Sequence, residues 1–264
     1  MDEYRPLVPS LEIWDLRKSF SINGRDHTVF SRLDLAVERG AFVVIVGESG
    51  SGKTTLLRII AGLETADRGS VLVGGSHLES VGTERGMVFQ EPRLLPWLTV
   101  RRNIAIGLEL RKLPKPEIDR TVDGFLHLVG LTSFASAYPA QLSGGMAQRV
   151  GIARALATSP EILLLDEPLG ALDALTKIRM QCELERIWQE QGVTMIMVTH
   201  DIEEAVYLGD RIVVMAKESA GIRETIPVSL PRPRDRSSAA FSAVREALLR
   251  EFHLSAHEPA TASS

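Results

Sequence analysis

The spacing of apolar residues divides the chain into three stretches. Over residues 11–46, apolar residues alternate with polar ones or run together, as in "LEIWDL" and "SRLDLAVERGAFVVIVG". This pattern predicts strands with a turn at Arg39-Gly40, and further short strands are predicted at "SVLVGG" and "RGMVFQ". From about residue 92 to 158 the apolar residues recur at helical spacing, so this block is predicted to be helical.

Strands and helices alternate again after this block. Buried strands are predicted at "EILLLD", "VTMIMVTH" and "RIVVMA". Helices are predicted at "DIEEAVYLGD" and at "DALTKIRMQCELERIWQEQG", where Gly192 would be the C-cap. Val/Ile/Leu strands that alternate with helices predict an α/β fold with a mostly parallel sheet covered on both faces. The helical block, about 92–158, is then an insertion into a core of about 11–91 and 159–230.

The two ends of the chain lack such periodicity. Residues 1–10 and the last segment, "AHEPATASS", are predicted to fray. The Pro/Arg-rich segment "LPRPRDRSS" is interpreted as a solvated connector to a last amphipathic helix, "AAFSAVREALLREF". Residues 231–264 are therefore expected to form a C-terminal helix and a flexible tail.

Composition limits the class of protein. With 264 residues, 44% apolar and 24% charged, the chain is an ordinary globular protein with enough length for a real core. Its net charge of −4 does not favour nucleic acid or an acidic membrane surface as a partner. The single cysteine, Cys182, excludes an internal disulfide and fits a reducing compartment, and we interpret it as a plain buried thiol.

Neither a leader nor a membrane span is predicted. The N-terminal "MDEYRPLVPS" is acidic and has no apolar segment of the kind that signal peptides carry. No apolar run approaches the roughly 18 residues needed to cross a bilayer. We therefore expect a chain that is soluble by itself and reaches a membrane only through a partner.

A glycine-rich loop carries the first chemistry. Gly47-x-x-x-x-Gly52-Lys53-Thr54 stands between a predicted strand and a predicted helix, which is the pattern of a phosphate-binding loop. Glycines let backbone amides at a helix N-terminus surround a phosphate, Lys53 would reach the β- and γ-phosphates, and Thr54 would give a hydroxyl to Mg²⁺. An accidental match arises in roughly one chain in a hundred of this length. The residues predicted to hold the nucleotide here are Gly47, Glu48, Ser49, Gly50, Ser51, Gly52, Lys53, Thr54 and Thr55.

Two adjacent carboxylates follow the strand "ILLL". Asp166 and Glu167 would be costly to desolvate unless a cation or a reaction uses them, and ligands of parallel sheets bind at the carboxyl ends of strands. Asp166 is predicted to hold Mg²⁺ and Glu167 to be the general base for a hydrolytic water. Alone this pair is a weak signal, because hydrophobic strands often end in acids; together with the phosphate-binding loop it is strong.

The segment "LSGGMAQRVGIARAL" resembles the signature of ABC-type ATPases, and the resemblance extends from about Leu11 to Ala216. It implies a P-loop fold of ABC type with an N-terminal antiparallel β-subdomain and an inserted helical subdomain. It also implies that the ligands are ATP and Mg²⁺. The site residues that it adds are an adenine-stacking Phe20, a magnesium-touching and catalytic Gln90, Ser143, Gly144 and Gly145 of the signature, Asp173 of the loop at the dimer interface, and a catalytic switch residue, His200.

Two of these residues have plainer interpretations. An aromatic residue near strands, such as Phe20, is more often part of a core, and a lone histidine after a strand is usually just a satisfied polar group. The place of Phe20 before the phosphate-binding loop favours stacking. The place of His200 at a strand end favours function. The other histidines lack the spacing of metal ligands and are predicted to lie on the surface: His27, His77, His127, His253 and His257.

The signature makes a second anion site. "SGG" opens a helix, so Ser143 and the amides that follow it can bind a phosphate as the first loop does. The resemblance implies that the two sites serve different nucleotides. Two copies would pack head to tail around a two-fold axis, with each ATP between Lys53 of one copy and Ser143 of the other.

Several kinds of ABC protein remain possible. A chromosome or repair ATPase would insert a long coiled coil between Lys53 and Ser143, and the 90 positions between them leave no room for one. A translation-associated protein would carry two copies of the core and a basic face. No membrane span is fused to the chain, which favours an importer over an exporter. The motifs resemble the nitrate/sulfonate/taurine importer group; the alternatives are an importer of another small solute and a non-transport ABC ATPase.

The partners follow from this resemblance. They are a second copy, integral membrane permease subunits, and indirectly a periplasmic or extracellular solute-binding protein, with no nucleic acid; the chain would be peripheral on the cytoplasmic face of the inner membrane. In "PRLLPW", the apolar Leu94, Leu95 and Trp97 lie on a predicted loop beside arginines, which suits a groove for a short helix of the permease. The equal alternative is that Trp97 packs under its own loop.

Overall fold

The fold is known from a computed structural model that describes residues 8–22, 24–217 and 221–255. The strands are β1 (Leu11–Ile22), β2 (Arg25–Val37), β3 (Phe42–Gly47), β4 (Arg68–Val73), β5 (Ser76–His77), β6 (Arg85–Val88), β7 (Ile162–Asp166), β8 (Thr194–Val198), β9 (Arg211–Met215) and β10 (Ile222–Pro227). The helices are α1 (Lys53–Ile60), α2 (Val100–Leu110), α3 (Lys115–Leu128), α4 (Gly144–Ala157), α5 (Ala174–Gln191), α6 (Ile202–Leu208) and α7 (Ala239–Ser255), with short 3-10 turns at Thr132–Phe134 and Pro139–Gln141.

A six-stranded sheet in the order β10-β9-β3-β8-β7-β6 forms the centre of the molecule. Its pairs from β9 to β6 are all parallel, and only β10 runs antiparallel, at one edge. Alternate side chains of β3 enter two different hydrophobic clusters: Val44 lies in one and Val43 in the other. The sheet is therefore covered on both faces, and the predicted α/β fold is confirmed.

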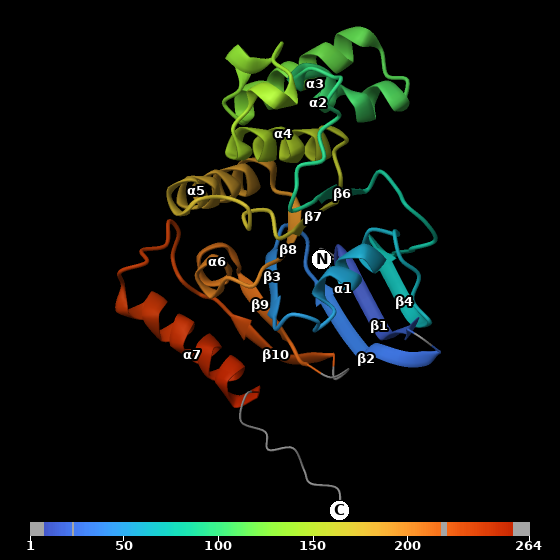
Figure 1. The fold of residues 1–264 in the computed structure, drawn as a ribbon, viewed down its shortest axis with the longest axis vertical. Helices are drawn as coiled ribbons and strands as arrows, with labels where there is room; N and C mark the ends of the chain where they lie inside the picture. The colour runs from blue at the N-terminus through green and yellow to red at the C-terminus, as the bar shows by residue number, and fades with distance from the viewer. Residues whose placement is uncertain (1–7, 23, 218–220, 256–264) are drawn as a thin grey trace, which may run out of the picture.

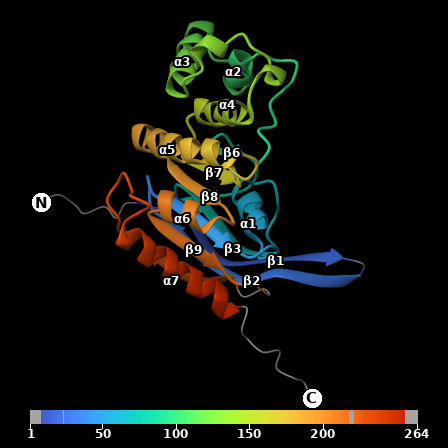
Figure 2. The same cartoon turned by 60° about the vertical axis from the view of Figure 1, so that its left-hand side comes forward.

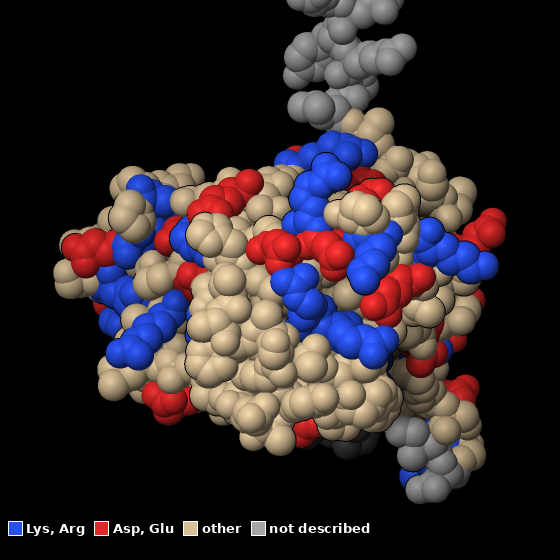
Figure 3. Space-filling view, turned by 90° about the horizontal axis from the view of Figure 1, so that it is seen from above, with Lys and Arg blue, Asp and Glu red and all other residues tan. Residues whose placement is uncertain are grey.

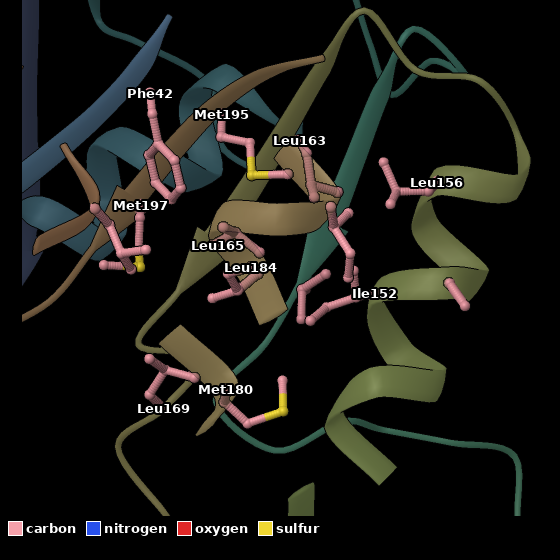
Figure 4. Close-up of a cluster of buried hydrophobic side chains, with 14 of the residues drawn as sticks. Phe42, Ile152, Leu156, Leu163, Leu165, Leu169, Met180, Leu184, Met195 and Met197 are labelled. Atoms are coloured by element: carbon pink, nitrogen blue, oxygen red, sulfur yellow. The ribbon is translucent and has the colours of Figure 1, made fainter. Parts of the chain in front are cut away.

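The larger cluster joins the inserted helices to this sheet. Figure 4 shows Ile152 and Leu156 of α4 facing Leu163 of β7, with Leu184 of α5 beside them. Helices α2, α3 and α4 follow β6 in the chain and stand together above the sheet in Figure 1. The packing of α4 on this cluster holds the helix at a defined position relative to the sheet. The start of this helix carries the second predicted anion site.

The second sheet is antiparallel, in the order β2-β1-β4-β5. Its hairpin of β1 and β2 is longer than the apolar pattern indicates, because both strands continue as polar, largely exposed segments past Lys18 and before Phe30. Figure 2 shows this hairpin extending beyond the rest of the fold. Strand β10 was not predicted either, since its residues are intermediate or exposed and alternate too weakly to give a signal.

Two predictions about the ends of the chain and one about Cys182 are corrected or left aside. Ser10 is not frayed: it is fully buried, and its hydroxyl lies 2.8 Å from Thr194 Oγ1. Cys182 is exposed rather than buried; it lies on the outer side of α5, and its sulfur is 3.5 Å from Tyr207 Oη. The frayed segments predicted at 1–7 and 256–264, which contain His257, lie outside the described residues, and nothing is described of the His253 side chain.

The connector before α7 is not a solvated linker. Arg234 is 5% exposed and donates to four carbonyl oxygens, those of Val206, Tyr207, Gly209 and Val228. Burial lowers the pKa of Arg234 to about 10. Arg232 donates to Glu185 Oε1 at 2.6 Å and to Asp210 Oδ1 at 2.9 Å. These arginines close the C-terminal end of α6 and attach the last helix to the core.

The surface agrees with the composition. On the face seen in Figure 3, Lys and Arg side chains are interspersed with Asp and Glu, without one continuous basic patch. Within the described residues, no helix combines the length and the apolar character that crossing a membrane requires.

Candidate functional site

The loop between β3 and α1 needs glycine at defined positions. Gly52 is the N-cap of α1 with φ 90°, and a Cβ built there would lie 2.5 Å from Val29 Cγ1. A Cβ at Gly47 would lie 2.6 Å from Ser51 Oγ and 3.1 Å from the Met215 carbonyl oxygen. The left-handed backbone at one position and the close approach at the other leave no room for a side chain. The loop therefore curls its backbone against β2 and β9, with its amides at the start of α1.

Lys53 lies inside this loop. It is 7% exposed, and its Nζ donates to the carbonyl oxygens of Gly47 at 2.7 Å and Glu48 at 2.8 Å. Burial lowers the pKa of Lys53, while the carboxylates of Glu167 and Asp166 act in the opposite direction. The ammonium group is thus held by carbonyl oxygens of the loop, beside two carboxylates.

The carboxylates stand at the end of β7, opposite the loop. Thr54 Oγ1 donates to Asp166 Oδ1 at 3.1 Å, and burial raises the pKa of Asp166 against this hydrogen bond. Glu167 Oε2 lies 3.1 Å from His200 Nδ1, which follows the neighbouring strand β8. Glu167 also has φ 46°, a left-handed conformation that costs a non-glycine residue energy and that recurs at functional sites.

Gln90 joins this group from the end of β6. A Cβ built on Gly170 would lie 3.1 Å from Gln90 Nε2 and 3.6 Å from Glu167 Oε2. The amide of Gln90 and the carboxylate of Glu167 therefore face the same point. Three neighbouring strand ends thus bring together Gln90, the Asp166–Glu167 pair and His200.

One cavity of about 410 Å³ collects half of the predicted nucleotide-binding residues, together with Glu167 and His200. It is lined by Phe20, Val29, Ser49, Gly50, Gly52, Lys53, Thr54, Thr55, Glu167 and His200. The Phe20 ring is half-buried and has Lys18 Nζ 4.7 Å from its centroid, so it is a wall of the cavity rather than core. Val29 was missed from the sequence, because an apolar residue within a strand carries no motif.

The residues of the second predicted anion site lie apart from this cavity. Ser143 is the N-cap of α4 and its Oγ accepts from the Met146 amide at 3.3 Å, while Asp173 caps α5 through the Thr176 amide at 3.1 Å. This hydrogen bonding lowers the pKa of Asp173. A Cβ at Gly145 would lie 2.8 Å from Thr176 Cγ2, so the two helix starts are close to each other. None of Ser143, Gly144, Gly145 and Asp173 lines the cavity around Lys53.

The profile of the family described as ABC transporter matches residues 30–170 of this chain. The chain belongs to the ABC transporter family. It is 46% identical over 235 residues to the aliphatic sulfonates import ATP-binding protein SsuB of Bacillus subtilis, covering 89% of this chain and 91% of that protein. It is 47% identical over 234 residues to the nitrate import ATP-binding protein NrtC of Synechocystis, covering 87% of this chain and 35% of that longer protein.

A solved structure agrees with this ABC fold. The dimeric, post-hydrolysis structure of an ATP-binding cassette bound to ADP and Pi superposes with a TM-score of 0.72 at 31% identity, covering 83% of this chain and 98% of that one. The ABC family and the ABC-type P-loop fold predicted from the motifs are thereby confirmed.

This ABC chain also has a polar network behind His200 that sequence reasoning missed. Thr199 Oγ1 donates to Glu204 Oε2 at 2.6 Å, and Lys177 Nζ lies 3.2 Å from Glu204 Oε1 and 3.1 Å from Asp201 Oδ2. Burial raises the pKa of Glu204. The network ties α5 to the turn that carries His200. The only hint in the sequence was the acidic start of α6.

Proposed function

We propose that this chain is the ATP-hydrolysing subunit of an ABC importer for aliphatic sulfonates, nitrate or taurine. The observation that carries the proposal is the single cavity that unites Lys53, Thr54, Glu167 and His200 at the strand ends, with Asp166 bonded to Thr54. The relatives named above are ATP-binding proteins of sulfonate and nitrate importers. Sulfonate and nitrate rest on those relatives and taurine on the resemblance of the motifs, since solute specificity would belong to partner proteins.

The roles proposed for the residues follow from their chemistry. Loop amides and Lys53 would bind the phosphates, and Phe20 would stack on the adenine. Glu167 would accept the proton of a hydrolytic water, and the position of His200 Nδ1, 3.1 Å from its Oε2, supports a role for His200 in orienting this carboxylate. Gln90, which faces the same point as Glu167, would position that water or the metal.

Magnesium fits the donors present. Thr54 Oγ1 and Asp166 Oδ1 are hard oxygen ligands 3.1 Å apart, and within the described residues no cluster of three His, Cys, Asp or Glu forms a complete protein cage. Mg²⁺ prefers this arrangement, since it takes one or two protein ligands and completes its shell with phosphates and water. When bound, the ion would neutralise charge on the phosphates; Thr54, Asp166 and Gln90 are the residues proposed to hold it.

The signature is proposed to act across a homodimer. Ser143 lies outside the cavity of its own chain, so a second copy is needed to bring "SGG" amides to the nucleotide. Leu175 and Ile178, next to Asp173 at the start of α5, are 70% and 45% exposed. An apolar stripe beside a helix start is suited to burial against a partner copy, which supports this arrangement.

The loop after Gln90 is the proposed docking surface for the permease. Trp97 is 69% exposed, so the alternative that it packs under its own loop is wrong, whereas Leu94 packs against the core. Asn103 fixes this loop by accepting from the Leu95 amide at 2.8 Å. We propose that a short permease helix covers Trp97 on the cytoplasmic face of the membrane, and that the permease in turn meets a solute-binding protein.

The test has two stages. The purified chain should hydrolyse ATP only with Mg²⁺, and with neighbouring permease subunits in proteoliposomes it should drive uptake of labelled taurine, alkanesulfonate or nitrate. If the complex hydrolyses ATP but takes up none of the three solutes, the proposed ATPase activity stands and the proposed class of solute is refuted. Absence of hydrolysis in the complete complex would refute the enzymatic proposal. The Trp97→Ala variant should no longer co-purify with the permease. Trp14→Ala is the control: Trp14 is also exposed, at 55%, and this variant should keep the permease.

A further inference from the structure

A second, larger hollow of about 740 Å³ lies away from the phosphate-binding loop, between the inserted helices and α5. It is lined by Arg120, Thr121, Gly124, Phe125, His127, Leu128, Gly130, Arg149, Glu183, Arg186, Glu190 and Gln191. None of these residues belongs to the site described above. Its volume is in the range of pockets that hold small organic molecules, about 300–1,000 Å³.

Two helix faces form the walls of this hollow. Arg120, Gly124 and Leu128 recur every four residues along α3, so they lie on one face of that helix. The opposite wall is the end of α5, and Arg149 of α4 completes the lining. Figures 1 and 2 show the inserted helices standing above α5. A ligand here would therefore touch both the insertion and the core.

The acidic side chains of the lining are already paired. Arg186 bonds to Glu183 Oε1 at 2.7 Å and to Glu190 Oε1 at 2.6 Å, and it also donates to the Leu128 carbonyl oxygen. The hydrogen bond to Glu183 is the largest cause that raises the pKa of Arg186. Both carboxylates are thus bonded to this guanidinium, and the three groups together carry one negative charge, which the two other arginines of the lining outweigh.

Two arginines of the lining, Arg149 and Arg120, form no ion pair with a carboxylate in the part of the chain that the structure describes. Arg149 donates from Nη1 to the Val129 carbonyl oxygen at 2.9 Å, and its Nε is buried with no hydrogen-bond partner among the described residues. Arg120 is exposed and forms no ion pair within the described part of the chain. The hollow is therefore cationic, and Phe125 and Leu128 give it an apolar side.

Gly124 leaves the space open. A Cβ built on Gly124 would meet no atom within 4 Å, although glycine in the middle of a helix costs roughly 0.5–1 kcal/mol relative to alanine. The helix carries this cost at a position that faces the hollow.

We propose that this hollow binds a small organic monoanion, whose carboxylate or sulfonate pairs with Arg149 and Arg120 while its aliphatic part lies on Phe125 and Leu128. The proposal is independent of the function proposed above, because it uses no residue of the nucleotide cavity. A guanidinium group binds a carboxylate or a sulfonate through two parallel hydrogen bonds, and the apolar wall then favours an aliphatic body over a bare inorganic ion.

The test is calorimetric titration of the full chain with hexanesulfonate and hexanoate, with inorganic sulfate as the head group alone. We expect binding of at least one of the two organic anions and weaker binding of sulfate. Gly124→Leu places a bulky side chain into the hollow beside Leu128 and should weaken binding at least tenfold, whereas Gly124→Ala, which adds one methyl group in open space, should bind as the natural chain does. Arg120→Gln should also weaken binding at least tenfold, and Arg25→Gln, at the exposed hairpin, should not.

Thermal unfolding of each variant separates lost binding from lost folding. If neither organic anion binds at millimolar concentration, the proposal is wrong. It is also wrong if a folded Gly124→Leu variant binds as tightly as the Gly124→Ala variant. Sulfate binding that equals hexanesulfonate binding would overturn the role of the apolar wall.

Discussion

His200 Nδ1 lies 3.1 Å from Glu167 Oε2, so two residues 33 positions apart in sequence meet at the carboxyl ends of adjacent parallel strands. The sequence alone does not show that these two residues are in contact. The register of β7 with β8 brings them together, and Glu167, whose φ is 46°, lines the cavity.

The carboxylate of Glu167 should be essential for turnover and dispensable for binding. Glu167→Gln keeps the shape of the side chain but cannot accept a proton from water, so we expect ATP hydrolysis to fall by about 10²–10⁴-fold. Nucleotide affinity should stay within a few-fold, and an ATP-bound dimer should accumulate. Steady-state hydrolysis and calorimetry measure the two effects, with Glu203→Gln, a change at an exposed position of α6, as the matched control. Normal turnover by Glu167→Gln would exclude the general-base role.

Lys53 should govern nucleotide affinity. Lys53→Ala removes a buried cation that now donates to the carbonyl oxygens of Gly47 and Glu48, and that is proposed to donate to phosphates in the complex. A hydrogen bond to a charged group contributes about 1.5–3 kcal/mol, so the Kd for ATP should rise roughly 10–100-fold. Calorimetry with Lys115→Ala as an exposed control checks this. An unchanged Kd would contradict the phosphate-binding role.

Much of this site was predictable because its chemistry is local. The phosphate-binding loop, the Asp166–Glu167 pair and the caps of α4 and α5 depend on neighbouring residues, and backbone geometry follows from glycine and capping side chains. Val29 and the network of Lys177 with Glu204 were not predictable, because they depend on which strands and helices become neighbours. A single sequence records no pairing of that kind.

The fold shows the same division. The buried strands of the parallel sheet have continuous apolar runs and were found, whereas β10 and the polar half of the β1–β2 hairpin have no such signal. The arginines before α7 were misinterpreted for a related reason. Arg234 satisfies buried carbonyl oxygens, and arginine in a Pro-rich segment normally indicates exposure to solvent.

Ser143 should matter for dimerisation rather than for folding. Ser143→Arg places a long cationic side chain where "SGG" amides are proposed to meet the partner's nucleotide, so the ATP-induced dimer should be lost while the single chain still binds ATP. Size-exclusion chromatography in the Glu167→Gln background measures this. Because Ser143 also caps α4, replacing it with a residue that cannot cap the helix should lower the free energy of unfolding by about 1 kcal/mol. Ser143→Asn, which keeps a capping side chain, gives the stability reference. A dimer that persists in Ser143→Arg would argue against the proposed arrangement.

Asp166 should lower the stability of the free protein at neutral pH. Burial raises its pKa, so the folded state binds the proton more tightly than the unfolded state does. Stability therefore falls as pH rises from the unfolded value of 3.8 through the folded pKa, and it stays lower above that window. Asp166→Asn should remove this penalty and raise the free energy of unfolding at pH 7 by about 1 kcal/mol, with no gain at pH 3. Denaturant unfolding at both pH values measures it; an equal gain at both would mean that ionisation is not the cause.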